Sequence, residues 1–179
     1  MKKFIIMAFA VAAIAIAPKA YSQTKMVGGA EMYPTKDIVD NAVNSKDHTT
    51  LVAAVKAAGL VETLKGKGPF TVFAPTNEAF AALPAGTVDK LLLPENKPML
   101  TKVLTYHVVA GKLSAKNLWA KAKASAKLQT VSGGWLWPKT EGEKLYLVDE
   151  KGGKSWVTIA DVNQSNGVIH VVNTVLMSK

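Results

Sequence analysis

The feature that most constrains the fold is the run at residues 167–177, which is nearly all apolar and carries one histidine. Side chains alternate along a strand, so His170 shares one face with Val172 while Ile169 and Val171 occupy the other. Because both faces are apolar, we expect a central strand over residues 168–176 with a largely buried His170. Buried histidines are usually held neutral by hydrogen bonds, so a bracing role is favoured over a catalytic or metal-binding one.

A second segment, residues 70–80, has the pattern of a strand that turns directly into a helix. Apolar, aromatic and β-branched residues occupy positions 70–74, and Pro75 ends the strand. Thr76 is a candidate N-cap, and Glu78 falls in the first helical turn, where the helix dipole favours a carboxylate. Asn77 is expected to satisfy free backbone donors at this helix start.

The order of the elements predicts an α+β domain. Apart from the strand at residues 70–74, helical patterns occupy the first half of the chain, and strand patterns predominate from residues 106–110 onward. Glycine-containing turns divide the later strands into two hairpins, at residues 128–137 and 144–162, followed by the final strand. Helices first and strands later indicate a twisted β-sandwich with helices packed against it. The sequence has no internal repeat, so we expect one such domain.

Three segments carry a resemblance to a known family. They are residues 71–80, residues 104–111 with the Tyr106–His107 pair, and residues 167–177. In this order they resemble the two terminal signature boxes and the central Tyr–His pair of the fasciclin (FAS1) domain. The resemblance extends from Asp37 to Met177. It implies the same helix-covered β-sandwich, and a function in adhesion, matrix binding or apolar-ligand carriage.

The resemblance also implies a role for the Tyr–His pair. In fasciclin domains the region around this pair is associated with receptor contact, which would carry over to Tyr106 and His107. The alternative is that both side chains only fix the junction between a helix and a strand.

The N-terminus has the pattern of an export signal. A basic start and fourteen uncharged residues precede small residues at positions 20 and 22, as in a secretory signal peptide. We expect cleavage after residue 22, an N-terminal arm at residues 23–36 and a FAS1-like domain at residues 37–177. The apolar run is short for a membrane anchor, which is the alternative. The protein is thus expected to be exported, to the periplasm or out of the cell.

The charged residues argue against a nucleic-acid partner. The formal net charge is +9, and all 22 basic residues are lysines. Arginine is the side chain that donates two parallel hydrogen bonds to phosphate or guanine, so its absence disfavours a protein that recognises nucleic acid. Lysine still attracts anionic surfaces, and a peripheral contact with them is compatible with this composition.

Motifs for catalysis are missing from the sequence. There is no Gly-x-Ser-x-Gly elbow, no His-Glu-x-x-His, no phosphate-binding glycine loop and no cysteine. The three histidines, His48, His107 and His170, lie far apart and none has metal-ligand spacing. We therefore expect no enzyme, no catalytic residue, no metal and no cofactor.

Two tryptophans are the best candidates for ligand contact. Trp135 and Trp137 are two residues apart on an expected strand, so both rings lie on one face with Leu136 opposite. Exposed indoles suit stacking on sugar rings, on a polyene or on a lipid. The alternative is that these rings cover the core or a neighbouring strand.

The lysine-rich segment at residues 120–127 follows a different pattern. As a strand it would place Lys121 and Lys123 on one side and alanines on the other, which is typical of a protected sheet edge. A helix is the other interpretation, because alanine and lysine are good helix formers. Lys121 and Lys123 are also candidates for contact with acidic polysaccharide or phospholipid headgroups.

These observations favour a secreted or periplasmic, non-enzymatic interaction module that binds cell-surface or matrix proteins or polysaccharides. The alternative is a carrier of an apolar small molecule such as a carotenoid or lipid, with the Trp135–Trp137 pair lining the groove. The ligand and the oligomeric state stay open at this level.

Overall fold

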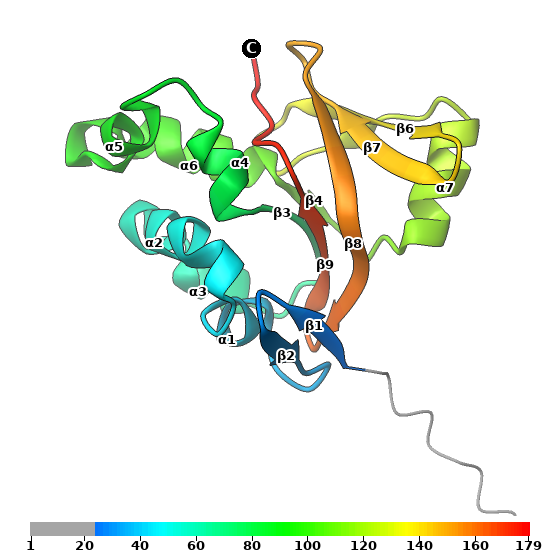
Figure 1. The fold of residues 1–179 in the computed structure, drawn as a ribbon, viewed down its shortest axis with the longest axis horizontal. Helices are drawn as coiled ribbons and strands as arrows, with labels where there is room; N and C mark the ends of the chain where they lie inside the picture. The colour runs from blue at the N-terminus through cyan, green and yellow to red at the C-terminus, as the bar shows by residue number, and fades with distance from the viewer. Residues whose placement is uncertain (1–23) are drawn as a thin grey trace, which may run out of the picture.

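The computed structural model describes residues 24–179, and the expected signal peptide at residues 1–22 lies outside them. A seven-stranded sheet forms the centre of the molecule (Figure 1), with the strand order β4-β3-β9-β8-β7-β6-β5. Strand β9 (Gly167–Val172) pairs in parallel with β3 (Phe70–Pro75) and antiparallel with β8 (Lys154–Gln164). The other strands are β4 (Val108–Ala110), β5 (Leu128–Gln129), β6 (Trp135–Glu141) and β7 (Lys144–Val148).

The sheet nearly closes on itself. Strands β4 and β5 are its two edges, and the Val131 N–H donates to the Val108 carbonyl across the seam at 2.8 Å. Strand β8 has two register shifts against β9, around Ile159. Such bulges bend and twist a strand, so β8 can pair with strands in both halves of the sheet. The expected α+β sandwich is therefore confirmed, with its layers formed by two halves of one sheet.

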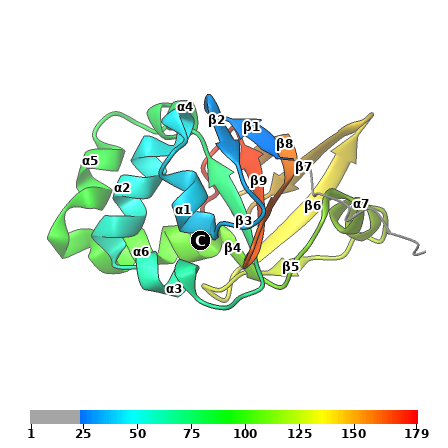
Figure 2. The same ribbon diagram turned by 90° about the horizontal axis from the view of Figure 1, so that it is seen from below.

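Within residues 24–179, six helices cover one side of this sheet, and a seventh lies at the other end of the molecule (Figure 2). The six are α1 (Ile38–Ala42), α2 (Thr49–Ala58), α3 (Val61–Lys65), α4 (Asn77–Ala81), α5 (Thr87–Leu92) and α6 (Lys97–Tyr106). The seventh is α7 (Ala115–Lys123), and two short 3₁₀ turns, η1 (Lys46–His48) and η2 (Pro94–Asn96), complete the set.

Strand β9 separates two hydrophobic cores. Ile169 and Val171 face the core under helices α1–α6, while Val172 faces a second core inside the folded sheet. His170 is fully buried, donates from Nε2 to the Leu113 carbonyl at 2.8 Å and accepts at Nδ1 from the Asp161 N–H at 3.3 Å. The prediction of a central strand with a bracing histidine is confirmed.

Several local predictions need correction. Strand β9 ends at Val172 rather than at residue 176, because Asn173 and Thr174 turn to bond the backbone and side chain of β8. Tyr106 is the last residue of α6 and not the first of a strand. Residues 25–32 of the expected arm form a hairpin, β1 (Lys25–Val27) with β2 (Ala30–Met32), which adds Val27 and Met32 to the helix-covered core.

The turn after β3 behaves largely as its sequence predicts. The Thr76 hydroxyl accepts from the Ala79 N–H at 3.3 Å and caps α4. Asn77, in contrast, serves another helix: its side-chain oxygen accepts from the Thr50 N–H at 3.0 Å, at the start of α2. Its amide donates to the Lys46 carbonyl at 2.9 Å. Asn77 thus joins two helix starts that are far apart in the sequence.

Candidate functional site

The outer face of strands β6, β7 and β8 carries a group of aromatic side chains. On the inner face, Leu136 and Leu147 are buried in the second core. Alternation places the intervening residues on the opposite face, where they are only half-buried. We call this surface the aromatic face, and it consists of Trp135, Trp137, Lys139, Tyr146, Lys154 and Trp156 on the strands, together with Lys127, whose Nζ lies over the Trp135 ring.

Strand register brings the aromatic side chains into contact. Tyr146 pairs directly with Trp156 across β7 and β8, and their ring centroids are 4.7 Å apart with a 44° tilt. Lys139 lies opposite Tyr146 on β6, which puts Trp137 diagonal to Tyr146. Diagonal neighbours on a sheet face lie within reach of aromatic side chains. Tyr146 and Trp156 are therefore in contact, and Trp137 lies on the same face within reach of Tyr146.

Lysines lie over these rings. The Lys154 Nζ is 5.2 Å from the Tyr146 ring centroid, and the Lys127 Nζ is 3.8 Å from that of Trp135. A cation over a ring is attracted by the ring's negative face. Within residues 24–179, neither these two lysines nor Lys139 forms a salt bridge. The aromatic face thus combines flat apolar surface with lysines that form no salt bridge within residues 24–179, and alternation places the Glu141 carboxylate on the same face.

Tyr106 supports this face from inside. Its side chain is 0 % exposed, and its hydroxyl donates to the Trp135 carbonyl at 2.7 Å and accepts from the Glu150 N–H at 3.1 Å. Burial raises the Tyr106 pKa to about 12, so the hydroxyl keeps its proton. The Glu150 carboxylate in turn accepts from the Trp135 N–H at 3.0 Å. Together these bonds fix the start of β6.

His107 is equally internal, at 2 % exposure. Its Nδ1 donates to the Val103 carbonyl at 2.8 Å, and its Nε2 accepts from the Leu176 N–H at 2.9 Å. Desolvation lowers the His107 pKa to about 4, so the ring is neutral. Tyr106 and His107, the residues for which the family resemblance implies receptor contact, are thus both buried and bonded to backbone. Both lie at the junction between α6 and β4.

The lysine-rich segment forms a helix and not an edge strand. Helix α7 begins with a capping box, in which Ser114 and Asn117 exchange side-chain and backbone hydrogen bonds. Lys121 lies in the last turn of α7 and lines an open groove at the seam between β4 and β5, together with Lys127. Lys123 is exposed outside that groove. Of the two predicted lysines, therefore, only Lys121 shares this groove with Lys127, the lysine that lies over the Trp135 ring.

Five contributors to this surface were missed in the sequence: Lys127, Lys139, Tyr146, Lys154 and Trp156. The signal that identifies them is the alternation of the two predicted hairpins taken together. Trp137 and Tyr146 each lie one residue from a buried leucine, so aligning those leucines places the aromatic residues on one shared face.

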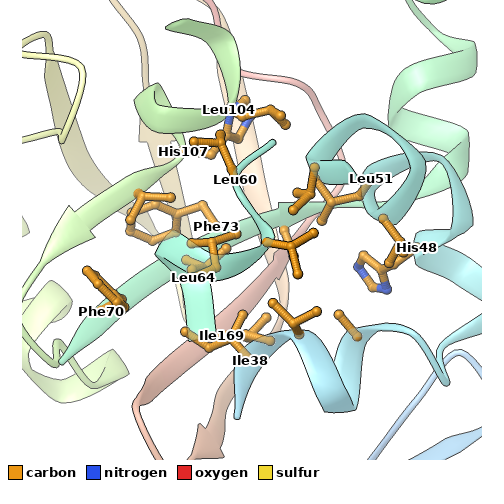
Figure 3. A pocket seen from close by; sticks show the side chains of 18 of the residues that line it. Ile38, His48, Leu51, Leu60, Leu64, Phe70, Phe73, Leu104, His107 and Ile169 are labelled. Atoms are coloured by element: carbon orange, nitrogen blue, oxygen red, sulfur yellow. The ribbon is translucent and has the colours of Figure 1, made fainter. Parts of the chain in front are cut away.

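A separate apolar cavity of about 80 Å³ lies between the helices and the sheet (Figure 3). Its lining comes mainly from α1, α2, α3 and β3, with Ile169 of β9 among the remaining residues. Trp135 and Trp137 line neither this cavity nor the groove at the seam. Both rings lie instead on the outer face of the sheet.

Comparison with known proteins agrees with this architecture. The model of the Fasciclin domain family matches residues 46–178. The chain belongs to the fasciclin domain family. Fasciclin domains are non-enzymatic, adhesion-type domains associated with cell-surface proteins.

Two relatives and one solved structure illustrate the similarity. Protein sll1483 of Synechocystis is 52% identical over 140 residues, which are 78% of this chain and 72% of the relative. Immunogenic protein MPB70 of Mycobacterium bovis is 38% identical over 141 residues, 76% of this chain and 66% of the relative. The FAS1 domain pair of the insect cell adhesion molecule fasciclin I superposes with a TM-score of 0.72 at 17% identity, covering 79% of this chain and 51% of that one. That last likeness concerns the fold alone.

Among residues 24–179, no helix has both the length and the apolar character needed to span a bilayer. Within the same residues, no three histidine or acidic side chains gather closely enough to hold a metal ion.

Proposed function

We propose that this fasciclin domain is an exported, non-enzymatic interaction module that binds an anionic polysaccharide of a cell surface or matrix through its aromatic face. One observation carries the proposal: four half-exposed aromatic rings share a surface opposite the core with three lysines that form no salt bridge within residues 24–179. The expected signal peptide at residues 1–22 supports export to the periplasm or out of the cell.

The chemistry of the aromatic face fits a charged sugar polymer. Indole and phenol rings offer flat apolar area for the C–H faces of sugars, together with polar edges. Lys127, Lys139 and Lys154 supply cations for carboxylate or sulfate groups. A neutral polysaccharide would contact only the rings, and a small anion would contact only the lysines. A uronate or sulfated polymer can contact both the rings and the lysines, so it fits the aromatic face best.

A repeating polymer would also compensate for the single binding site of the protein. A single domain with one face offers one weak site, and adhesion gains strength from several linked sites. A polysaccharide presents the same epitope many times, so several protein molecules can bind along one chain.

The test is affinity electrophoresis of residues 23–179 in gels with alginate, a uronate polymer, or with neutral dextran. We expect retardation by alginate and, for Trp137→Ala and Trp156→Ala, a loss of affinity of roughly tenfold or more. Trp119→Ala is the matched control, because Trp119 lies on α7 and not on the aromatic face. Equal loss in all three folded variants, or no retardation of the wild type, would contradict the proposal.

A second function, carriage of an apolar small molecule, is favoured by the cavity beneath the helices. Its lining is almost wholly hydrocarbon, as apolar binding sites require. Mass spectrometry of an organic extract of protein purified from its own host tests this function. A stoichiometric apolar compound would support it, and an empty protein from that source would count against it.

A further inference from the structure

The seam between the two edge strands of the sheet is only partly closed. Strand β4 pairs with β3 and β5 pairs with β6, and within residues 24–179 no ladder joins β4 to β5. A backbone hydrogen bond crosses the seam from the Val131 N–H to the Val108 carbonyl at 2.8 Å. Figure 2 shows the two strands next to one another. The sheet is therefore closed at one end of the seam and unpaired beyond it.

On β4, the backbone groups of Ala110 point into the seam. The His107 carbonyl accepts from β3 and the Gly111 N–H donates to the segment before β3, so both residues direct backbone groups toward β3. Successive residues of a strand direct their N–H and carbonyl groups to opposite sides. Ala110 therefore directs its own groups away from β3, and its side chain is exposed.

The same holds for Gln129 on β5. The neighbouring Thr130 N–H donates to the Gly134 carbonyl at 2.9 Å, so Gln129 directs its N–H and carbonyl away from β6. The pairings from β4 round to β5 are antiparallel except for β3 with β9, so β4 and β5 run in opposite directions. Counting on from residues 131 and 108, a ladder would place Gln129 opposite Ala110. Unpaired edges of this kind are templates for another strand.

An open groove of about 360 Å³ lies at this part of the seam. Its apolar lining includes Val109, Leu113 and Leu128, which belong to the second core or pack against it. The charged residues of its lining are Lys121 and Lys127. The groove thus combines cations, apolar side chains and unpaired backbone groups.

No acidic side chain lines the groove, and residues 96–140 contain lysines but no aspartate or glutamate. Two carboxylates from other elements contact neighbouring backbone. Asp161 accepts from the Ala115 N–H at the start of α7, and Glu150 accepts from the Trp135 N–H at the start of β6. A negatively charged occupant is therefore favoured. A second copy of this chain is disfavoured, because its formal net charge is +9.

We propose that an extended acidic peptide segment of a partner protein binds along this groove and adds a strand to the free edge of β5 at Gln129. In this mode of binding, main-chain hydrogen bonds give affinity, and contacts with alternate side chains give specificity. Apolar side chains of the peptide contact Leu113 and Leu128. The carboxylates between them approach Lys121 and Lys127. A polysaccharide has no peptide groups to continue the ladder, so a peptide fits this site better. The groove goes beyond the proposed polysaccharide site, with which it shares Lys127.

The test is fluorescence anisotropy of a labelled peptide of about seven residues, in the usual range of strand lengths, in which glutamate and valine alternate. The protein is residues 23–179, the expected exported form. We expect this peptide to bind and its lysine–valine counterpart to show no measurable binding. Two analogues carry N-methyl groups on all valine or on all glutamate nitrogens. Alternate N–H groups pair at a strand edge, so at least one analogue should bind roughly tenfold more weakly.

Protein variants locate the bound peptide. Gln129→Pro removes an N–H that points away from β6, and edge strands tolerate proline, so the fold should persist while affinity falls about three- to tenfold. Lys121→Gln should weaken binding about two- to fivefold. Lys123→Gln is the matched control, because Lys123 lies on the same helix outside the groove. Trp156→Ala, on the aromatic face, should leave peptide binding unchanged.

Three results would overturn the proposal. The first is no binding of the glutamate–valine peptide, or equal affinity for it and both N-methyl analogues. The second is loss of binding in Trp156→Ala with retention in Lys121→Gln, which would assign the peptide to the aromatic face. The third is sedimentation of the protein alone as a dimer that Gln129→Pro dissociates, which would assign the groove to a second copy. If Gln129→Pro does not fold, the N-methyl analogues still decide. Retardation by alginate is measured separately, so polysaccharide binding can fail or hold independently.

Discussion

The hydroxyl of Tyr106 donates a 2.7 Å hydrogen bond to the carbonyl of Trp135, 29 residues further along the chain. The same hydroxyl accepts from the Glu150 N–H, so one buried side chain bonds the backbone on both sides of the hairpin that carries Trp137 and Tyr146. Tyr106 therefore connects the second core to the aromatic face, although it does not lie on that face.

Replacing this tyrosine should destabilise the domain. In Tyr106→Phe the ring still fills its site, but the Trp135 carbonyl and the Glu150 N–H lose a partner in a partly buried environment. We expect the free energy of unfolding to fall by about 1–3 kcal/mol, measured by urea denaturation. Tyr33→Phe is the control, because that hydroxyl is exposed and bonds only Glu31. A loss of equal size in both variants would contradict this role.

Stability should decline as the pH falls through the range of the buried histidines. The native pKa of His107 is lowered from 6.5 to about 4, so below pH 6.5 the unfolded chain binds a proton that the native protein does not. The stabilisation is thus complete above pH 6.5 and is lost progressively toward pH 4, by about 3 kcal/mol for this group.

His48 and His170 have lowered pKa values and act in the same direction. Urea midpoints between about pH 7 and about pH 4.5 should reveal the decline, with a shallower slope in His107→Gln. If the urea midpoints of wild type and His107→Gln change equally with pH, His107 is not neutral in the native protein over this pH range.

Asn166 is expected to be among the most sensitive polar residues. Its side chain accepts from the Ile38 N–H at 3.1 Å and donates to the Leu64 and Gly66 carbonyls at 2.7 and 2.9 Å. Asn166→Ala leaves all three backbone groups without this partner, and we expect a loss of about 2–4 kcal/mol in thermal or urea unfolding. Asn163→Ala, which removes one long 3.4 Å bond, should cost far less.

Salt should separate the two components of the proposed polysaccharide site. Charge attraction from Lys127, Lys139 and Lys154 is screened at high ionic strength, while ring stacking is not. Raising the salt to about 0.5 M should therefore weaken alginate binding by roughly tenfold. Residual binding should still depend on Trp137, as measured by the retardation of Trp137→Ala. Binding to alginate that is unchanged by salt would argue against the lysines.

The sequence alone was enough for the fold class and for the position of its most buried strand. An apolar run on both faces, as at Ile169 and Val171, is stable only between two layers, and helices before strands limit the architecture. The paired tryptophans were also found this way, because alternation is a local property of a strand. Local patterns of this kind need no knowledge of distant segments.

The tertiary structure decided which side chains act together. The boundary between α6 and β4, and the choice of helix for residues 115–123, depend on distant partners and on a cap at Ser114 that the lysine pattern hid. Likewise, only packing shows that Tyr106 and His107 face inward and that His48 borders a cavity. Burial and hydrogen-bond partners arise from contacts between residues far apart in the chain, and local periodicity does not predict such contacts.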